Sequence, residues 1–148
     1  MFVMMPHTYS SMLVHCVFST KDRRDLIPDP HHLWQYLAGI ARNKEIPLIA
    51  AGGTANHLHL LLDLPPTMPL SQALQVLKGN SSHWLNGIHP FAWQQGYGAF
   101  AVGQSQRATV VSYIDHQEEH HRKYSFEQEF VTLLRKYGIV YDDRFVFG

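Results

Sequence analysis

The stretch IPLIAAGGTANHLHLLL, residues 46–62, holds two apolar runs joined by a short link that contains glycine. The first run, 46–51, ends at Gly52-Gly53, and the second, 57–62, ends just before Pro65-Pro66. Short apolar runs bounded by glycine and proline predict β-strands. A link this short predicts that the two strands form an antiparallel hairpin.

Further elements are predicted on both sides of this hairpin. Residues 12–19 are apolar and β-branched and predict an earlier strand, and residues 99–102 predict a fourth. A helix that opens at Asp29 or Pro30 is predicted by apolar residues at helical spacing, namely Leu33, Leu37, Ile40 and Ala41. A second helix, with Ser71 near its start, is predicted by Leu70, Leu74 and Leu77.

Two more helices are predicted toward the C-terminus. Ser105 is the expected N-cap of a helix over 106–121, and Ser125 is the expected N-cap of the next. The apolar face of that last helix consists of Phe126, Phe130, Leu133 and Leu134. This order of elements predicts an α+β fold with a ferredoxin-like antiparallel sheet, helices on one face, a C-terminal tyrosine-bearing helix and a further helix. Residues 1–148 are predicted to form a single domain.

The composition is that of a globular protein with an unusual number of histidines. Of 148 residues, 45% are hydrophobic and 16% are charged, and the formal net charge is zero. Eleven histidines raise the expectation of a metal or catalytic site. With Cys16 as the sole cysteine, no internal disulfide can form, which favours a cytoplasmic protein. No apolar run approaches the ~20 residues of a membrane helix, and residues 1–6 lack the basic leader of a signal peptide.

His57 and His59 are separated by one residue on the second strand of the predicted hairpin. Side chains alternate along a strand, so both imidazoles face the same way, roughly 6.6 Å apart at ~3.3 Å per residue. Leu58, Leu60 and Leu62 then face the core. Two imidazole nitrogens at that spacing can bind one metal ion. The pair taken alone is a weak pattern that favours two polar residues on the wet face of a half-buried strand over a metal site.

A second group of polar residues lies in the predicted helix 106–121. Helix positions i, i+3, i+4 and i+7 share a face, which places four side chains on one stripe: Tyr113, His116, Gln117 and His120. The stripe also fits a solvated helix face. A rival functional interpretation takes His116 and His120 as a zinc-binding pair. It ranks lower because the chain offers no Cys partner and no His-Glu-x-x-His arrangement.

Together the two groups resemble the single-tyrosine transposases of insertion sequences, which belong to the HUH endonuclease superfamily. His57-Leu58-His59 matches the His-hydrophobic-His motif of that superfamily, and Tyr113 with Gln117 matches the Tyr-x-x-x-Gln motif of these transposases. Surrounding segments are similar too, namely 19–24, 77–82, 93–97 and 117–123. The related REP-associated tyrosine transposases carry Asn-Pro shortly after the tyrosine. Gln117-Glu118 stands there in this chain, so the insertion-sequence branch fits better.

The resemblance implies a metal-dependent transposase that cleaves and rejoins single-stranded DNA. It implies that His57, His59 and Gln117 bind a divalent ion, Mg²⁺ or Mn²⁺, and that Tyr113 is the nucleophile. Tyr113 would form a covalent 5′-phosphotyrosine and release a 3′-hydroxyl. The phosphodiester energy stays in that link, so no nucleotide cofactor is expected.

The same resemblance implies the partners of the protein. It predicts recognition of DNA hairpins near element ends by a homodimer in which the tyrosine helix of one subunit can complete the metal site of the other. Gly103, just before that helix, would permit such a movement, and the sequence leaves open whether Tyr113 acts in its own subunit. Stacking on bases is possible for Trp84, Trp93 and Tyr97, although a tryptophan is more often a core residue. The expected DNA contacts are Lys21, Arg23, Arg24, Lys78, Ser81, Arg107, Arg122 and Lys123.

Two alternatives stay open at this stage. The chain could be a non-catalytic protein that binds DNA hairpins and descends from such an enzyme. Retention of both histidines, the tyrosine and the glutamine argues against this. The chain could also be a zinc protein that uses His116 and His120.

For the predicted DNA contacts, the alternative is that these side chains are solvated surface charges without a role in DNA binding. The zero net charge of the chain supports this alternative.

Overall fold

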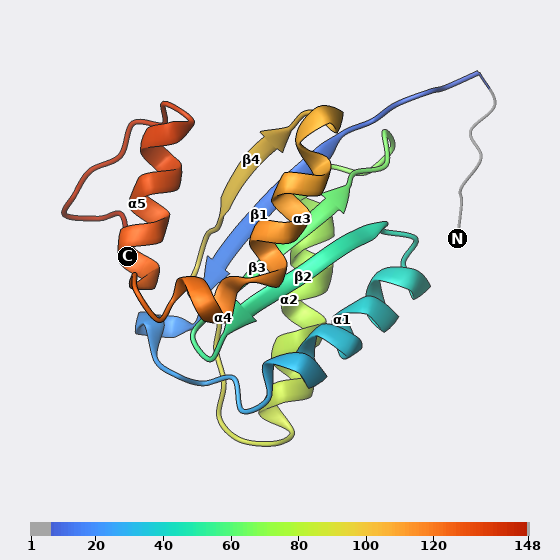
Figure 1. Cartoon of the computed structure of the whole chain (residues 1–148). Coiled ribbons are helices and arrows are strands. Elements are labelled where there is room, and N and C mark those ends of the chain that lie inside the picture. The colour runs from blue at the N-terminus through green and yellow to red at the C-terminus, as the bar shows by residue number, and fades with distance from the viewer. Residues whose placement is uncertain (1–6, 148) are drawn as a thin grey trace.

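The computed structural model describes residues 7–147, so the predicted absence of a signal peptide at residues 1–6 lies outside it. The described residues form four strands and five α-helices (Figure 1). The strands are β1 (Leu13–Ser19), β2 (Leu48–Thr54), β3 (His57–Asp63) and β4 (Gly98–Val102). The α-helices are α1 (Pro30–Asn43), α2 (Leu70–Asn86), α3 (Arg107–Asp115), α4 (Gln117–His120) and α5 (Phe126–Lys136). Two 3₁₀ helices, η1 (Lys21–Arg23) and η2 (Gln104–Gln106), complete the order.

The strands form one sheet in the order β2-β3-β1-β4. All neighbouring strands are antiparallel, and β1 and β3 occupy the centre. The register places Ser19 opposite His57 and Val17 opposite His59. The predicted ferredoxin-like α+β fold is therefore confirmed, and the two histidines lie on a central strand.

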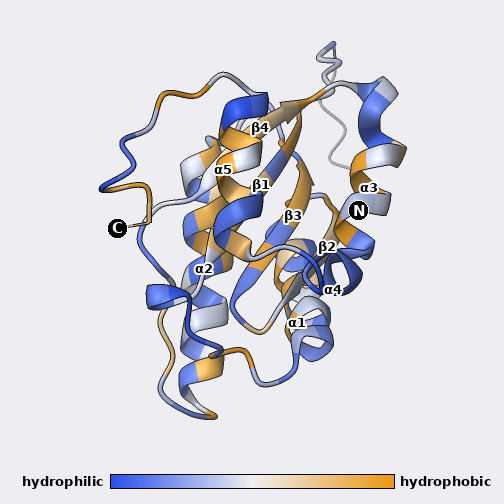
Figure 2. Cartoon of the chain, turned by 60° about the vertical axis from the view of Figure 1, so that its left-hand side comes forward, coloured by the Kyte–Doolittle hydropathy of each residue, from blue (hydrophilic) through white to orange (hydrophobic). Residues whose placement is uncertain are grey.

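The two faces of the sheet pack against different helices. Leu58, Leu60 and Leu62 of β3 join the main core, which α1 and α2 cover with Leu33, Leu37, Leu74 and Leu77. The opposite face carries His57, His59 and Leu61, and α3, α4 and α5 lie over it (Figure 1). The strands are largely hydrophobic, whereas α4 is hydrophilic (Figure 2). The sequence predicts helices on one face of the sheet. The structure has helices on both faces, because α3, α4 and α5 cover the second face.

Helix α3 approaches the sheet very closely at one glycine. A Cβ at Gly52 of β2 would overlap the carbonyl oxygen and side chain of Ile114. The predicted end of this strand at Ala51 is wrong, because β2 continues through Gly52-Gly53 to Thr54. The turn of the hairpin is therefore formed by Ala55 and Asn56.

The predicted helix over 106–121 is broken into two pieces. Helix α3 ends at Asp115, His116 leaves helical geometry at φ −105° and ψ 26°, and α4 begins at Gln117. Two side chains compete there with backbone N–H groups for carbonyls of α3. The His116 Nδ1 bonds the Ser112 carbonyl at 2.7 Å, and the side-chain amide of Gln117 donates to the Tyr113 carbonyl at 3.4 Å.

The predicted caps differ in outcome. Asp29 caps α1 by accepting from the His32 amide, and Ser125 caps α5 in a reciprocal capping box with Gln128. Ser105 does not cap α3, because it lies inside η2 and Gln106 holds the N-cap position. Among residues 7–147, no helix is long and apolar enough to span a membrane.

Candidate metal centre and active site

His57 and His59 are buried, not exposed on a wet strand face. Both side chains have 0% exposure, and their rings lie 5.1 Å apart. Their Nε2 atoms point into the space beneath α4 and α5. The His57 Nε2 lies 3.0 Å from Oε1 of Gln117, and the His59 Nε2 lies 2.8 Å from Oε1 of Glu129. The structure thus brings together His57 and Gln117, two of the three metal ligands that the family resemblance implies.

Two residues that the sequence analysis did not select complete this group. His121 Nε2 lies 2.9 Å from the Gln117 Oε1 and 3.2 Å from the Glu129 Oε1. Candidate ligand atoms of His57, His59, His121 and Glu129 all lie within 4.8 Å of one another. We call the five side chains that meet here the donor cluster: His57, His59, Gln117, His121 and Glu129.

The donor cluster holds more lone pairs than protons to satisfy them. Nδ1 of His121 bonds the backbone carbonyl of Tyr124 at 2.8 Å and must carry a proton, so the neutral ring presents a bare Nε2. That Nε2 faces oxygens of Gln117 and Glu129, which are acceptors as well. A bound cation, or a proton on His121, removes this conflict. The donor set therefore fits a metal ion, as nitrogen and oxygen ligands of a divalent transition metal do.

Each HUH imidazole is also fixed on the side that faces away from the cluster. Nδ1 of His57 lies 2.9 Å from Oδ1 of Asn56 and 3.0 Å from the Thr54 hydroxyl. Nδ1 of His59 lies 2.8 Å from Nε2 of His15, a residue with 3% exposure on β1. Such outer hydrogen bonds set the tautomer and orientation of metal-binding imidazoles.

Tyr113 reaches the donor cluster through Glu129. Its hydroxyl donates to Oε2 of Glu129, while Oε1 of the same carboxylate faces the imidazoles. The Gln117 amide donates to Oε2 at 3.0 Å, which leaves Oε1 of Gln117 facing the imidazoles. Burial and then the Glu129 carboxylate raise the pKa of the Tyr113 phenol above its usual range.

The charge of the site is concentrated on Glu129. Burial tends to raise the pKa of this carboxyl, but hydrogen bonds from His121 and His59 outweigh burial and hold the pKa well below its usual range. Burial lowers the pKa of His57 to about 3, with a further contribution from His59. For His121, the hydrogen bond and charge of Glu129 outweigh burial and raise the pKa. The resting cluster is thus an anionic carboxylate surrounded by imidazoles.

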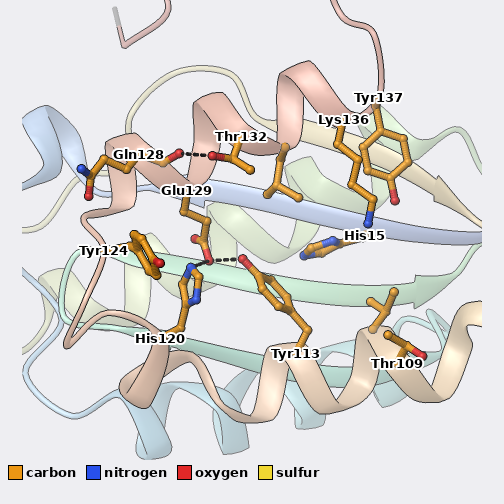
Figure 3. A pocket seen from close by; sticks show the side chains of 12 residues that line it. His15, Thr109, Tyr113, His120, Tyr124, Gln128, Glu129, Thr132, Lys136 and Tyr137 are labelled. Carbon is orange, nitrogen blue, oxygen red and sulfur yellow. Dashed lines mark hydrogen bonds and ion pairs between the residues drawn. The ribbon is translucent and has the colours of Figure 1, made fainter.

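A cavity of about 440 Å³ opens beside Tyr113 between α3 and α5 (Figure 3). Tyr113 and Thr109 line it from α3, and Glu129 and Lys136 line it from α5. His15 lies at its base on β1. Solvent can reach the side of Tyr113 through this cavity, whereas His57, His59 and Gln117 of the donor cluster are buried.

His116 and His120 do not form a pair. His116 is exposed and its Nδ1 turns back to the Ser112 carbonyl, away from the donor cluster. The His120 Nε2 lies 3.3 Å from Oε2 of Glu129 at an angle that makes no hydrogen bond, and it finds no other partner within residues 7–147. The predicted common stripe therefore holds for Tyr113, Gln117 and His120 but not for His116, because α3 is interrupted there.

The predicted DNA contacts fall into two groups. Exposed or half-buried cations lie in η1 and around α3 and α4, namely Lys21, Arg23, Arg24, Arg107, Arg122 and Lys123. Of these, Arg23 donates to the Phe147 carbonyl at 2.9 Å. Lys78 and Ser81 of α2 instead form hydrogen bonds with backbone carbonyls of the fold. The Lys78 Nζ donates to the carbonyls of Gln94 and Gly96, and the buried Ser81 hydroxyl bonds the Leu77 carbonyl.

The aromatic candidates and Cys16 also have defined places. Trp84 stacks on Tyr36 at 4.4 Å, and the indole N–H of Trp93 donates to Ser81, so both tryptophans pack in the fold. Tyr97 is 43% exposed. Burial raises the pKa of the Cys16 thiol to about 12, in agreement with its predicted role as a small core side chain.

Comparison with known proteins identifies the family. Residues 8–117 match the family described as "Transposase IS200 like". The transposases for insertion sequence element IS200 of Salmonella typhimurium and Salmonella typhi are each 32% identical over 124 residues, which cover 76% of this chain and 81% of the relative. The chain belongs to the IS200-like transposase family. The buried histidines are consistent with the HUH metal site that this family resemblance implies.

Solved structures agree on the fold of this IS200-like transposase. The crystal structure of a proposed transposase from Deinococcus radiodurans R1 aligns with a TM-score of 0.62 at 24% identity, over 79% of this chain and 98% of the other. A REP-associated tyrosine transposase bound to a REP hairpin aligns with a TM-score of 0.61 at 17% identity, over 82% of this chain and 74% of the other. Both likenesses concern the fold alone.

Proposed function

We propose that this IS200-like transposase cleaves and rejoins single-stranded DNA through a covalent bond between Tyr113 and a 5′ phosphate. One observation carries the proposal. The Tyr113 hydroxyl and the donor cluster share a single carboxylate, because Oε2 of Glu129 accepts from Tyr113 and Oε1 faces the imidazoles. A nucleophile beside a cation site is the arrangement that phosphoryl transfer requires.

The ion-binding residues we propose are His57, His59 and Gln117, with His121 and Glu129 as further donors. A divalent ion bound there would supply positive charge to the oxygens of the scissile phosphate. Three imidazole nitrogens favour manganese over magnesium, which prefers oxygen ligands. His57, His59 and Gln117 are buried, so the imidazoles and Glu129 would hold a divalent ion in a medium of low polarity.

Tyr113 supplies the attacking oxygen in this mechanism. Its oxygen forms a bond to phosphorus, the bond from phosphorus to the 3′ oxygen breaks, and the leaving 3′ oxygen takes a proton from water. Oε2 of Glu129 orients the phenol and is placed to receive its proton. The reverse reaction, in which a 3′-hydroxyl attacks the phosphotyrosine, rejoins the strand without a nucleotide cofactor.

The DNA substrate we propose is a single strand that carries a hairpin. The related REP-associated transposase was solved with a REP hairpin. In this chain, Lys21 and Arg24 lie just after β1, whose last residue pairs with His57, and Arg122 and Lys123 follow His121. Cations thus flank the donor cluster on two sides, where they can contact phosphates by charge.

The proposal is tested with single-stranded oligonucleotides that carry the ends of the flanking genomic DNA. With manganese, the wild-type protein is expected to form a covalent adduct that survives denaturing electrophoresis. Tyr113→Phe should bind the same DNA and form no adduct. Tyr9→Phe is the matched control, because Tyr9 is 94% exposed and remote from the site. An adduct with Tyr113→Phe would exclude Tyr113 as the nucleophile.

The same experiment separates the enzyme from a non-catalytic hairpin-binding protein. Such a protein would shift the hairpin in a native gel but give no adduct and no cleaved strand with manganese. The zinc alternative finds no support in the geometry, because His116 is exposed and turned away from His120 and the donor cluster. We further propose that the protein acts as a homodimer, as the family resemblance implies.

A further inference from the structure

The cavity beside Tyr113 is built from two helices and one strand. Its volume of about 440 Å³ lies in the range of about 300–1,000 Å³ that is usual for ligand pockets. Apolar and aromatic side chains form much of its wall, including Val110, Leu133 and Tyr137. A cavity of this size and character can accept one nucleoside.

Lys136 is the only lysine or arginine among the described residues that line this cavity. It lies two turns after Glu129 on α5, and Figure 3 shows its side chain extending toward His15. No carboxylate pairs with it among residues 7–147.

The cavity also contains one negative group, Glu129, whose carboxylate already interacts with neighbouring side chains. Its two oxygens face His59, His121 and the Tyr113 hydroxyl. The positive charge of Lys136 stands at the other end of the cavity and is free to meet an incoming anion. The cavity thus combines a negative group, a free positive group and apolar wall residues.

Besides the free positive charge of Lys136, the cavity has aromatic side chains on which a base can stack. Tyr137 stacks against Phe100 at 4.8 Å and is held in place, and Tyr124 lines the end near His120. Bases stack on fixed aromatic rings with little dependence on sequence. The ammonium of Lys136 can then contact the phosphate of the same nucleotide.

We propose that the cavity between α3 and α5 binds one nucleotide of single-stranded DNA next to the scissile phosphate, with Lys136 contacting a phosphate of that nucleotide. This inference rests on the proposed role of Tyr113, whose hydroxyl lies at the cavity wall. Lys136 is a DNA-binding residue in this view, and the cavity places the strand so that its phosphate meets Tyr113.

The test measures DNA binding in a Tyr113→Phe background, which prevents reaction. The probe is a fluorescein-labelled twelve-nucleotide oligothymidylate, titrated by fluorescence anisotropy at several potassium chloride concentrations. Lys136→Met is expected to weaken binding about fivefold or more, and to reduce the slope of log Kd against log salt by about 0.7, the value for one phosphate contact on a single strand. Lys136→Arg should restore both.

Two further variants make the result specific. Lys44→Met removes an exposed lysine at the end of α1, on the other face of the sheet, and should leave Kd and slope unchanged. Thr132→Phe fills the cavity from an exposed position on α5 and should weaken binding without changing the slope. Equal Kd and slope for Lys136→Met and Lys44→Met would overturn the proposal.

This outcome is distinguishable from failure of the proposed function. If the wild-type protein forms the adduct but Lys136→Met binds normally, the cavity proposal alone is wrong. If Lys136→Met weakens binding but no adduct forms with wild-type protein, the cavity proposal stands and the catalytic role of Tyr113 is wrong.

Discussion

At the scale of single residues, the hydrogen bond between His15 and His59 stands out because neither ring is exposed to water. The two nitrogens lie 2.8 Å apart, and the rings stack at 5.0 Å. If the Nε2 of His59 binds an ion, its Nδ1 carries the proton and donates to His15. His15 is then a positioning residue for the metal centre, although it touches no ligand atom of the ion.

Replacement of His15 tests that role. His15→Phe is expected to weaken Mn²⁺ binding by about 10–100-fold, the usual effect of losing an outer hydrogen bond. Isothermal titration calorimetry measures the affinity, and thermal unfolding in EDTA shows whether the metal-free fold is intact. His83→Phe, at an exposed position on α2, is the control. Unchanged Mn²⁺ affinity in a folded His15→Phe protein would show that His59 needs no such partner.

The same buried imidazoles predict how stability depends on pH. Burial lowers the pKa of His15 and of His57 to about 3, so both stay neutral in the folded protein. Their unfolded forms take up protons below about pH 6.5, and the free energy of unfolding must therefore fall as the pH falls from about 6.5 toward 3. The pKa of His120 is also lowered, chiefly by burial, whereas His121, with a raised pKa, acts in the opposite sense and is one group against three.

Urea unfolding of the metal-free protein in EDTA, between about pH 7 and 5, measures this dependence. We expect lower stability at the lower pH. Stability that is constant or higher at pH 5 would contradict the burial of neutral histidines.

At the scale of secondary-structure elements, the position of α3 depends on a missing side chain in β2. Gly52 lets Ile114 of α3 lie directly on the strand. Gly52→Ala is expected to lower the free energy of unfolding by about 1–3 kcal/mol, because the added methyl group overpacks this contact. Gly79→Ala, on α2 where nothing lies within 4 Å, should instead stabilise by about 0.5–1 kcal/mol. Chemical denaturation compares the two, and similar effects would contradict the close packing of α3.

The elements also show what sequence reasoning could and could not reach. The strands, α1, α2 and α5 followed from apolar periodicity and caps, because these signals are local. The break at His116 did not, since it arises from side chains that compete for carbonyls within the helix. His121 and Glu129 were therefore not selected from the sequence, although His121 lies at the end of the predicted helix 106–121. The signal available for Glu129 was its place between Phe126 and Phe130, on the buried side of an amphipathic helix.

At the scale of the whole molecule, Tyr113 and the donor cluster come from one chain. Gln117 reaches His57 of the same chain at 3.0 Å. Mixing Tyr113→Phe with a His57→Ala/His59→Ala variant is therefore expected to yield no covalent adduct, because neither chain holds a complete site. Recovery of the adduct on mixing would show that the tyrosine helix of one subunit serves the metal centre of another. The wild-type protein, at the same total concentration, is the positive control.

The most direct measurement identifies the residue joined to DNA. Trypsin cuts after Arg107 and Arg122, and the fragment 108–122 contains one tyrosine, Tyr113, together with Gln117 and His121. After reaction with manganese and nuclease trimming, mass spectrometry should find this fragment carrying a 5′-linked nucleotide, and EDTA should abolish it. A nucleotide on any other fragment, or an adduct that forms equally well in EDTA, would contradict a metal centre at His57 and His59 that serves Tyr113.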